Sequence, residues 1–423
     1  MEKTSFDVER TAMELVMSDD VTKKKQLAKK IFDAAYEEGV YPSSIHEFYM
    51  ARGRGEFSGF TVPAMNLRSM TYDLARAIFR AAKKIDSSTF VFEIARSEIG
   101  YTDQSPIEFA SMVLAAALKE GYSGPVFIQG DHFQVNAARF KENPEKEIEG
   151  LQALIRDAIS SGFYNIDIDS STLVDISKAD FKEQQLLNYE VCARLTQFIR
   201  HIEPKGITIS VGGEIGEIGQ QNSTPEDLHA FMAGLKEKLP KGLAGTSKIS
   251  VQTGTTHGGV VLPDGSIAQI KLDFNTLRIL SDIARREYGL AGAVQHGAST
   301  LPPEAFHKFV ECETAEVHLA TDFQNMIYES EHFPASLKKR IYDWLKVNAA
   351  GEAKKGETED QFLYKTRKKA LGPFKKEIWR LPQLTRDAIA LELENKFDFL
   401  FKQLNIVNKR SLVDKYVHVA KKT

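Results

Sequence analysis

Eight short segments rich in β-branched and aromatic residues alternate with amphipathic helical segments, and this alternation constrains the fold more than any other feature of the sequence. Residues 145–160 are typical of the helical segments, because Ile148, Leu151 and Ile155 fall on one helix face. The alternation predicts an α/β fold of the (β/α)8 TIM-barrel type. A doubly wound open sheet is the alternative, because the number of strands does not by itself establish closure. The expected strands cover residues 60–66, 89–95, 125–131, 164–169, 207–214, 248–254, 292–297 and 315–321.

The expected barrel domain covers residues 57–327, which is close to the typical length of this fold. Residues 1–56 are expected to form an N-terminal helical segment, in which residues 22–39 show helical spacing and end at Gly39. Residues 328–423 are expected to form a C-terminal helical extension. Such an extension beyond a finished barrel often serves a subunit interface, so we expect a homo-oligomer, either a dimer or a tetramer.

One part of the extension is strongly basic. Residues 354–380 contain nine Lys or Arg side chains and four Asp or Glu side chains. A solvated helix face is the favoured interpretation of such a run of charges. A phosphate contact to a neighbouring subunit is the alternative.

The charge and hydropathy of the chain limit its classes of partner. Lys and Arg number 55 against 58 Asp and Glu, so nucleic acid is not expected as the main partner. No segment approaches the roughly 18 apolar residues of a membrane helix, and the charged N-terminus lacks a signal-peptide core. Cys192 and Cys312 form neither a disulfide framework nor a metal-binding spacing. We therefore expect a cytoplasmic protein without a membrane or nucleic-acid partner.

Three histidines follow the expected strands at equivalent places. His132, His257 and His296 lie at or just beyond the ends of the third, sixth and seventh strands. All strand ends of a barrel meet at one mouth, where active sites lie. Three neutral imidazoles around one open position are typical of a catalytic zinc site. His318, within the eighth strand, is ambiguous. The other histidines lie in expected helices or loops and are interpreted as surface or satisfied residues: His46, His201, His229, His307, His332 and His418.

Carboxylates are expected at the same mouth. Asp131 directly precedes His132, and Asp169 ends the fourth strand beside two serines. Glu214 ends the fifth strand, and Glu217 follows it by three residues. A metal site needs oriented acceptors around its ligands, and acid–base chemistry needs a titratable group near the substrate. Helix capping or loop solvation is the structural alternative for these acids, above all for Glu217.

Small residues accompany two of the candidate ligands. Gly258 follows His257, and Gly297 follows His296. Because glycine has no side chain, backbone amides can approach an anion closely at such positions. Barrels commonly bind phosphate at their later strands. A phosphorylated sugar is therefore an expected ligand.

These motifs, taken in order, resemble the class II, metal-dependent fructose-bisphosphate aldolase family over roughly residues 57–327. The resemblance rests on the first strand and its Asn66, the Asp131–His132 pair and the aspartate–serine turn that begins at Asp169. It continues through the later part of the chain. The remaining segments that carry it are THGG at 256–259, KLDFNTL at 271–277 and HGAS at 296–299.

The resemblance implies a carbon–carbon lyase of carbohydrate metabolism that reversibly cleaves a ketose phosphate. The default substrate is fructose 1,6-bisphosphate, which would give the glycolytic products dihydroxyacetone phosphate and glyceraldehyde 3-phosphate. His132, His257 and His296 would bind one Zn2+ per subunit, although Co, Mn or Fe also suit three histidines. Glu214 would be a further or alternative ligand. The metal would polarise the ketose carbonyl and stabilise the enediolate left when C3–C4 breaks.

The resemblance also implies roles for residues that contact the substrate. Asp131 would be the acid–base residue at the C4 oxygen, and Glu217 would replace the family's proton-shuttling glutamate. The residues implied to bind substrate are Asn66, Asp169, Gly258, Gly297, Ser299 and Thr321.

Several positions depart from the family pattern. His318 and Ala320 stand where members usually carry Asn and Asp, and Ala95 stands where a phosphate-contacting serine is usual. The metal site is therefore expected to be intact and the phosphate site remodelled. Two alternatives stay open on this basis. One is a zinc-dependent sugar or sugar-acid epimerase or isomerase, and the other is a non-catalytic aldolase-like subunit.

Overall fold

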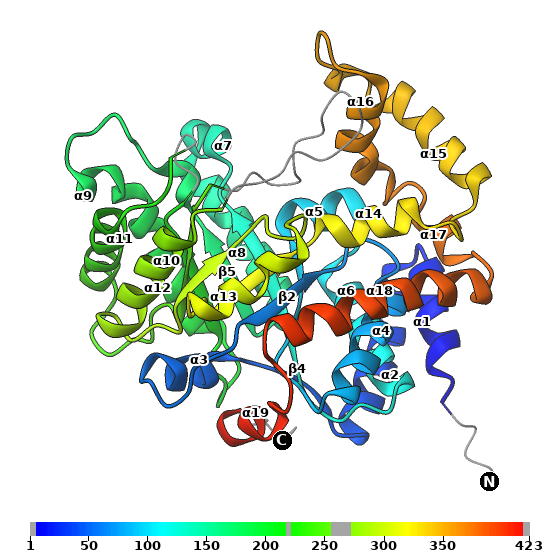
Figure 1. Cartoon of the computed structure of the whole chain (residues 1–423), viewed down its shortest axis with the longest axis horizontal. Coiled ribbons are helices and arrows are strands. Elements are labelled where there is room, and N and C mark those ends of the chain that lie inside the picture. Colours follow the sequence, from blue (N-terminus) through cyan, green and yellow to red (C-terminus); the bar gives the residue numbers. More distant parts are fainter. Residues whose placement is uncertain (1–5, 217–220, 255–271, 418–423) are drawn as a thin grey trace.

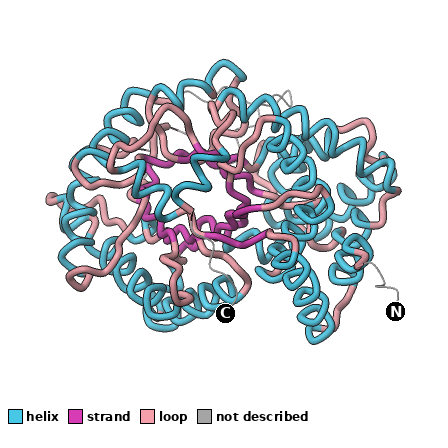
Figure 2. Tube along the Cα trace, turned by 90° about the horizontal axis from the view of Figure 1, so that it is seen from below, coloured by secondary structure: helices cyan, strands magenta, loops and turns pink. Residues whose placement is uncertain are grey.

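The computed structural model describes residues 6–216, 221–254 and 272–417. Among these residues, eight parallel strands form a ring that helices surround, as the view in Figure 2 shows. The order around the ring is β4-β3-β2-β9-β8-β7-β6-β5, and β5 pairs with β4 to close it. Closure confirms the predicted (β/α)8 TIM barrel and excludes the open sheet. The strands are β2 Val62–Asn66, β3 Val91–Ala95, β4 Gly124–Gln134, β5 Asn165–Asp169, β6 Ser210–Glu214, β7 Lys248–Val251, β8 Ala293–Gln295 and β9 Glu316–Leu319.

Helices cover the outside of the barrel because each presents one apolar face to the strands. In α8 this face is Ile148, Leu151 and Ile155, all fully buried. Helix α11 (Pro225–Lys238) begins with a capping box between Thr224 and Asp227. The helices between β2 and the end of the barrel are α4 Thr71–Lys84, α5 Arg96–Thr102, α6 Pro106–Lys119, α7 Ala137–Glu142, α8 Pro144–Ser160, α9 Phe181–Gln184, α10 Leu186–Ile202, α11 Pro225–Lys238, α12 Phe274–Arg286, α13 His307–Glu311 and α14 Thr321–Glu329.

The N-terminal segment contains a strand that the sequence did not predict. After α1 Val8–Met17 and α2 Val21–Glu37, strand β1 (Val40–Ser43) pairs in parallel with the first residues of β4. Helix α3 His46–Gly53 follows it. The strand escaped prediction because it has only four residues, one of them proline, and directly follows a helix. The first 56 residues are therefore part of the sheet as well as of the helical layer.

The C-terminal extension folds back onto the barrel. Its longest helix, α18 Gln383–Gln403, lies along α4, where Glu394 pairs with Arg80 and Arg386 pairs with Asp73 (Figure 1). A short 3-10 turn, η4 Arg367–Ala370, packs near α5. The division of the chain at residues 56 and 327 stays a prediction. The other helices of the extension are α15 Ala335–Asn348, α16 Glu359–Thr366, α17 Lys375–Trp379 and α19 Arg410–Tyr416.

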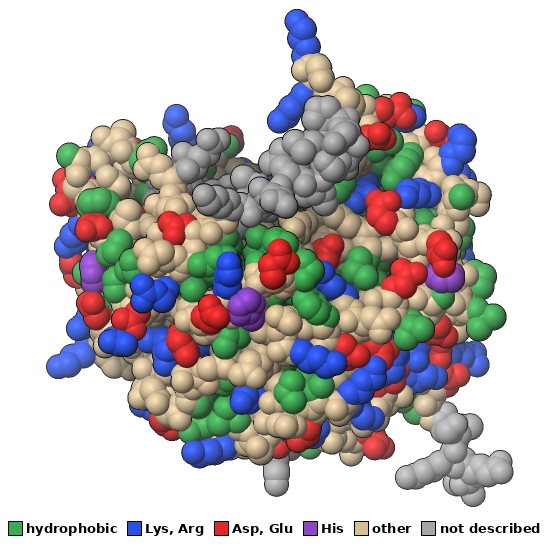
Figure 3. Space-filling view, viewed as in Figure 1, with side chains coloured by type: hydrophobic (Ala, Val, Ile, Leu, Met, Phe, Trp, Pro, Cys, Tyr) green, Lys and Arg blue, Asp and Glu red, His purple; other side chains and the backbone are tan. Residues whose placement is uncertain are grey.

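The surface carries charges of both signs. Acidic and basic side chains are interspersed on the face seen in Figure 3, in keeping with the net charge of −3. In the described part of the chain, no helix has both the length and the apolar content needed to cross a membrane.

Candidate active site

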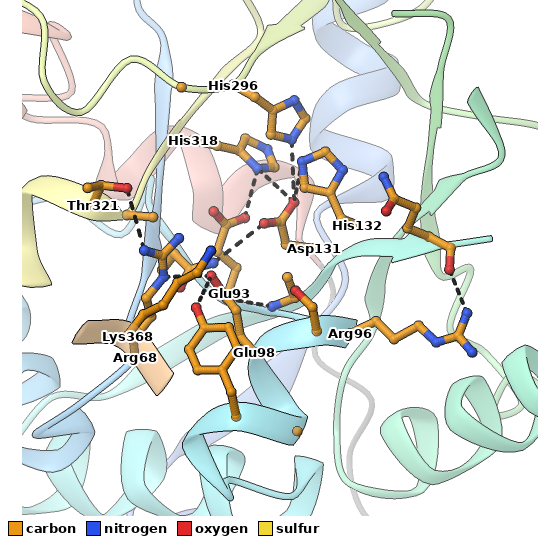
Figure 4. Close-up of a pocket in the computed structure, with 18 of the residues that line it drawn as sticks. Arg68, Glu93, Arg96, Glu98, Asp131, His132, His296, His318, Thr321 and Lys368 are labelled. Atoms are coloured by element: carbon orange, nitrogen blue, oxygen red, sulfur yellow. Dashed lines mark hydrogen bonds and ion pairs between the residues drawn. The ribbon is translucent and has the colours of Figure 1, made fainter. Parts of the chain in front are cut away.

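A cavity of about 730 Å3 lies at the carboxyl ends of the strands, where the sequence places the candidate residues. Its lining comes from the ends of β2, β3, β4, β8 and β9, from α5 and α7, and from one side chain of the C-terminal extension, Lys368. Figure 4 shows the side chains that converge there. Residues far apart in the sequence meet because parallel barrel strands all end at this face.

Asp131 lies at the centre of the cluster, on β4. Its carboxylate oxygen Oδ1 is 3.2 Å from His318 Nδ1 and 3.4 Å from His296 Nε2, while Asn66 Nδ2 donates to Oδ2 at 3.4 Å. Burial alone would raise the pKa of Asp131, but the charge of His132 and hydrogen bonds from His296 and His318 hold it well below its ordinary value. Asp131 is thus an anion held by imidazoles.

His132 occupies an unusual backbone position. Its φ of 39° lies in the left-handed region, and the pairing of β4 with β5 shifts register between Gly130 and Phe133. A β-bulge at this point turns the side chain toward the mouth. A Cβ at position 130 would come within 2.5 Å of the Phe133 ring, so glycine is required for this local packing. The strain at His132 is typical of a functional position.

Two carboxylates contact the Nδ1 atom of His132. Its Nδ1 lies 2.9 Å from Asp169 Oδ2 and 3.2 Å from Glu214 Oε2. The pKa of Asp169 falls to about 2, because hydrogen bonds from His132 and Ser171 outweigh its burial. Burial and the charge of Asp169 raise the pKa of Glu214 to about 8. Both acids therefore lie within reach of the imidazole that they orient.

His296 completes the arrangement of imidazoles. Its ring centroid is 4.1 Å from that of His132 and 4.1 Å from that of His318. Burial and the two neighbouring imidazoles lower the pKa of His296 well below its ordinary value, so its ring is neutral, the form that binds metals. The ligand atoms of Asp131, His132 and His296 lie within 4.8 Å of one another, as do those of His132, Asp169 and Glu214.

The structure brings most of the predicted site residues together. Asn66, Gly297, Ser299 and Thr321 line the cavity, while Asp169 and Glu214 lie behind His132. Gly297 has a φ of 69°, a conformation that favours glycine. The remaining predictions, Glu217, His257 and Gly258, lie outside the described residues.

The family follows from comparison with known proteins. A model of the family described as fructose-bisphosphate aldolase class-II matches residues 54–371. The chain belongs to this family. No curated protein matches the sequence.

Solved structures share the fold of this class II aldolase family member at low sequence identity. The fructose-bisphosphate aldolase of Campylobacter jejuni is 18% identical, with a TM-score of 0.53, and the match covers 88% of this chain and 96% of that one. The fructuronate-tagaturonate epimerase of Cohnella laeviribosi is 12% identical, with a TM-score of 0.58, and the match covers 83% of this chain and 82% of that one. At such identities the likeness concerns the fold alone.

In this family member, His318 lies at the centre of the site, although the sequence left its role open. His318 links Asp131 to Glu316, whose Oε1 is 2.6 Å from His318 Nε2. The sequence could have indicated this, because residues two apart on a strand point to the same face, and Glu316 and His318 both point into the barrel. His46, in contrast, was interpreted as a surface or satisfied residue, but it is buried and its Nδ1 has no hydrogen-bond partner.

Below the mouth, the barrel interior of this family member holds a compensated cluster of charges. Lys248 on β7 is fully buried, and its Nζ lies 2.9 Å from Asp167 Oδ2, 2.7 Å from Gln129 Oε1 and within hydrogen-bond reach of Glu316. Burial lowers the pKa of Lys248, but Asp167 and Glu316 raise it above its ordinary value overall. The lysine is therefore a charged structural group.

One glycine makes room for this cluster. Gly212 on β6 pairs with Asp167 and Lys248, its neighbours on the adjacent strands. A Cβ at position 212 would come within 2.3 Å of Asp167 Oδ1. Gly212, the first of the two glycines before Glu214, is therefore needed for the packing of the charged cluster in the barrel interior.

Proposed function

We propose that the chain is a metal-dependent aldolase that reversibly cleaves a ketose phosphate, with fructose 1,6-bisphosphate as the default substrate and Zn2+ as the default metal. The observation that carries the proposal is the position of Asp131. Its buried, ionised carboxylate lies among three imidazoles at the mouth of the barrel, next to oxygen donors that can support a metal. Family membership supports the same reaction class.

The donor set fits a divalent cation. His132 and His296 offer neutral or deprotonable imidazole nitrogens, and Glu214 offers a carboxylate on the same side of His132. His257 is proposed as the third imidazole ligand on the strength of its motif. Asp169 orients His132 through Nδ1, which is the arrangement that fixes a ligating ring. When bound, a divalent metal supplies Lewis-acid polarisation of a carbonyl oxygen.

Asp131 is proposed to move the proton at the C4 oxygen. In the cleavage direction it accepts the proton of the C4 hydroxyl as the C3–C4 bond breaks, and C4 leaves as the aldehyde. The electron pair of that bond moves to C3 and delocalises over the adjacent carbonyl. Proton delivery to C3 then completes the ketone product, and Glu217 is proposed as the carrier. Asn66, which donates to Asp131, holds the base in position.

An epimerase that acts on a sugar or sugar acid is the second candidate. It is favoured by the replacement of the family's Asn and Asp by His318, on β9, and Ala320, directly after it. The fold is also shared with a fructuronate-tagaturonate epimerase. Because an epimerase would break only a C–H bond, it would release no triose.

A substrate panel separates the two candidates. Purified chain is loaded with Zn2+ and offered ketose monophosphates, ketose bisphosphates and hexuronates, and both triose release and epimer formation are measured. Chelator-sensitive triose release is the expected result. Epimer formation from a hexuronate without triose release would replace the aldolase with the epimerase. Absence of both products would leave the non-catalytic subunit as the better account.

A further inference from the structure

The cavity has two chemically different ends. Asp131 and its imidazoles form one end, and basic side chains gather at the ends of β2 and β3. Figure 4 shows Arg68 and Lys368 on the same side of Asp131, while the Arg96 side chain extends away from it. Arg96 is already engaged, because its guanidinium donates to the Gln134 carbonyl at 2.6 Å and pairs with Glu147. Arg68 and Lys368 are thus the cations that share one wall.

Arg68 is held in a fixed orientation. Its Nε donates to Glu98 Oε1 at 2.6 Å, and its Nη1 lies 3.4 Å from Thr321 Oγ1. Only 15% of its side chain is exposed. The carboxylate of Glu98 is shared further, since it also accepts from the Ala95 amide and the Tyr101 hydroxyl. Glu98 is thus the carboxylate that pairs with Arg68 among the described residues, and its two oxygens accept from three donors.

Lys368 reaches the cavity from the C-terminal extension. It belongs to the turn η4, which is anchored by the buried Arg367 through hydrogen bonds of 2.6 Å to Glu329 and to Asn325. The amide of Gly372 also donates to the Tyr101 carbonyl at 3.0 Å. These contacts fix the turn on the barrel, so Lys368 is presented to the cavity while its ammonium stays accessible to a ligand.

The other Lys and Arg side chains between residues 365 and 376 have carboxylate partners. In the described chain between residues 365 and 376, Lys368 is the Lys or Arg side chain for which no carboxylate lies within ion-pair distance. Its Nζ lies instead 5.8 Å from the centroid of the Tyr101 ring. Burial and the nearby Arg68 lower the pKa of Lys368, and Glu98 offsets this only in part. The paired neighbours are Lys365 with Glu357, Arg367 with Glu329, Lys369 with Glu352, Lys375 with Glu108 and Lys376 with Asp19.

We propose that Arg68 and Lys368 form a subsite for the anionic end of the substrate, and that this chain's own C-terminal extension supplies one of the two cations. The ligand chemistry is a phosphate or carboxylate group, which accepts several hydrogen bonds from such donors. This identification of the substrate class rests on the proposed function. It also replaces the two interpretations of the basic stretch, because Lys368 lines the cavity of its own chain.

The test measures anion binding without requiring turnover. Inorganic phosphate and, separately, gluconate are titrated calorimetrically into the metal-free full-length chain and into three variants. Lys368→Met removes the charge, Lys368→Arg keeps it, and Lys369→Met removes an equal charge from the same turn outside the cavity. Loss of charge-assisted hydrogen bonds should weaken binding on the order of 10- to 100-fold in Lys368→Met. Lys368→Arg and Lys369→Met should bind like the wild type.

Each outcome decides the proposal. Tight binding of phosphate with weak binding of gluconate identifies a phosphorylated substrate end, and the reverse identifies a sugar acid. Equal binding by Lys368→Met and wild type, equal weakening by Lys369→Met, or no binding of either anion to the wild type would overturn the subsite. Because these titrations use no catalytic step, an inactive wild type in the substrate panel overturns the aldolase proposal alone.

Discussion

The floor and the mouth of the barrel both contain buried charges, but they balance them differently. On the floor, the ammonium of Lys248 lies between Asp167 and Glu316, so each charge has a counter-charge within the chain. At the mouth, three carboxylates lie around the imidazole of His132: Asp131, Asp169 and Glu214. The floor is thus complete as a structure, whereas the proposed metal ion would add a positive charge among the carboxylates of the mouth.

This difference separates stability from activity. Breaking a buried, compensated pair leaves an uncompensated charge and destabilises the fold. A substitution at the mouth should remove a group that the proposed reaction needs and leave the fold intact. The predictions below test whether the two layers separate in this way.

The largest expected effect is on the mouth. Asp131→Asn keeps the shape of the side chain but removes the base, so kcat should fall by about 100- to 10,000-fold. Zinc content and the free energy of unfolding should change little. Steady-state kinetics, metal analysis and urea unfolding measure the three quantities. Asp175→Asn, an exposed residue, is the control and should keep full activity. A comparable loss of stability and activity in Asp131→Asn would contradict the distinction.

On the floor, Lys248→Met should destabilise the chain by about 3 to 5 kcal/mol, because Asp167 and Glu316 would stay buried without their cation. Urea unfolding of metal-free protein measures the change. Lys182→Met, which breaks an exposed pair with Glu237, is the matched control and should cost at most about 1 kcal/mol. If Lys248→Met unfolds like the control and loses its activity, the floor belongs to the catalytic machinery.

His46, the first residue of α3, should determine part of the pH dependence of the free energy of unfolding. Burial and the charge of Arg200 lower the pKa of His46 to about 4, against about 6.5 in an unfolded chain. The unfolded chain therefore binds more protons between these values, and the stabilising contribution is present above pH 6.5 and lost as pH falls toward 4. The loss amounts to about 3 kcal/mol.

The variant His46→Asn isolates this contribution. Unfolding free energies of wild type and variant, measured between pH 7.5 and pH 4.5, should converge or cross as pH falls. A constant difference across the range would show that His46 does not titrate on unfolding, and would assign the acid sensitivity to the mouth.

The smallest expected effect is at the junction of the two layers. His318→Asn retains a donor near Asp131 but loses the contact with Glu316, so kcat should fall on the order of 10- to 100-fold while KM and zinc content change little. Kinetics and metal analysis check both statements. The exposed His307→Asn is the control. A change confined to KM would instead place His318 in substrate binding.

The alternation of strands and helices predicted the barrel because the secondary-structure preference of each segment agrees with the structure that it adopts in the folded chain. Seven of the eight expected strands contain the observed ones, and β4 extends beyond its expected range at both ends. The ends of parallel strands brought His132, His296 and Asp131 to one face. This much of the site could be predicted, since geometry alone assembles it. The bulge that re-aims His132 could not, because it depends on how Phe133 packs over Gly130.

The roles of Lys368 and His318 in the site were harder to predict. Lys368 lies in a run of charges that resembles an ordinary helix face, and the lack of a carboxylate partner distinguishes it from Arg367 and Lys369 in the same turn. The role of His318 depends on Glu316 and Asp131 lying at the right height on two different strands. Such features follow from which side chains meet in three dimensions, and local sequence patterns do not contain that information.

Strand β1 has a consequence for how the chain is made. It shares one edge of β4 with β5, since Val40 pairs with Gly124 and Gln129 pairs with Asn165. During synthesis, β1 therefore emerges long before the strand that receives it, and the sheet edge at β4 becomes complete only after residue 169 has been added. The segment of β1 therefore stays unpaired while β2 and β3 are made. Because β5 closes the ring on β4, a chain that lacks β1 should still form a closed barrel, with the edge of β4 at Gly124–Phe127 left without a partner strand.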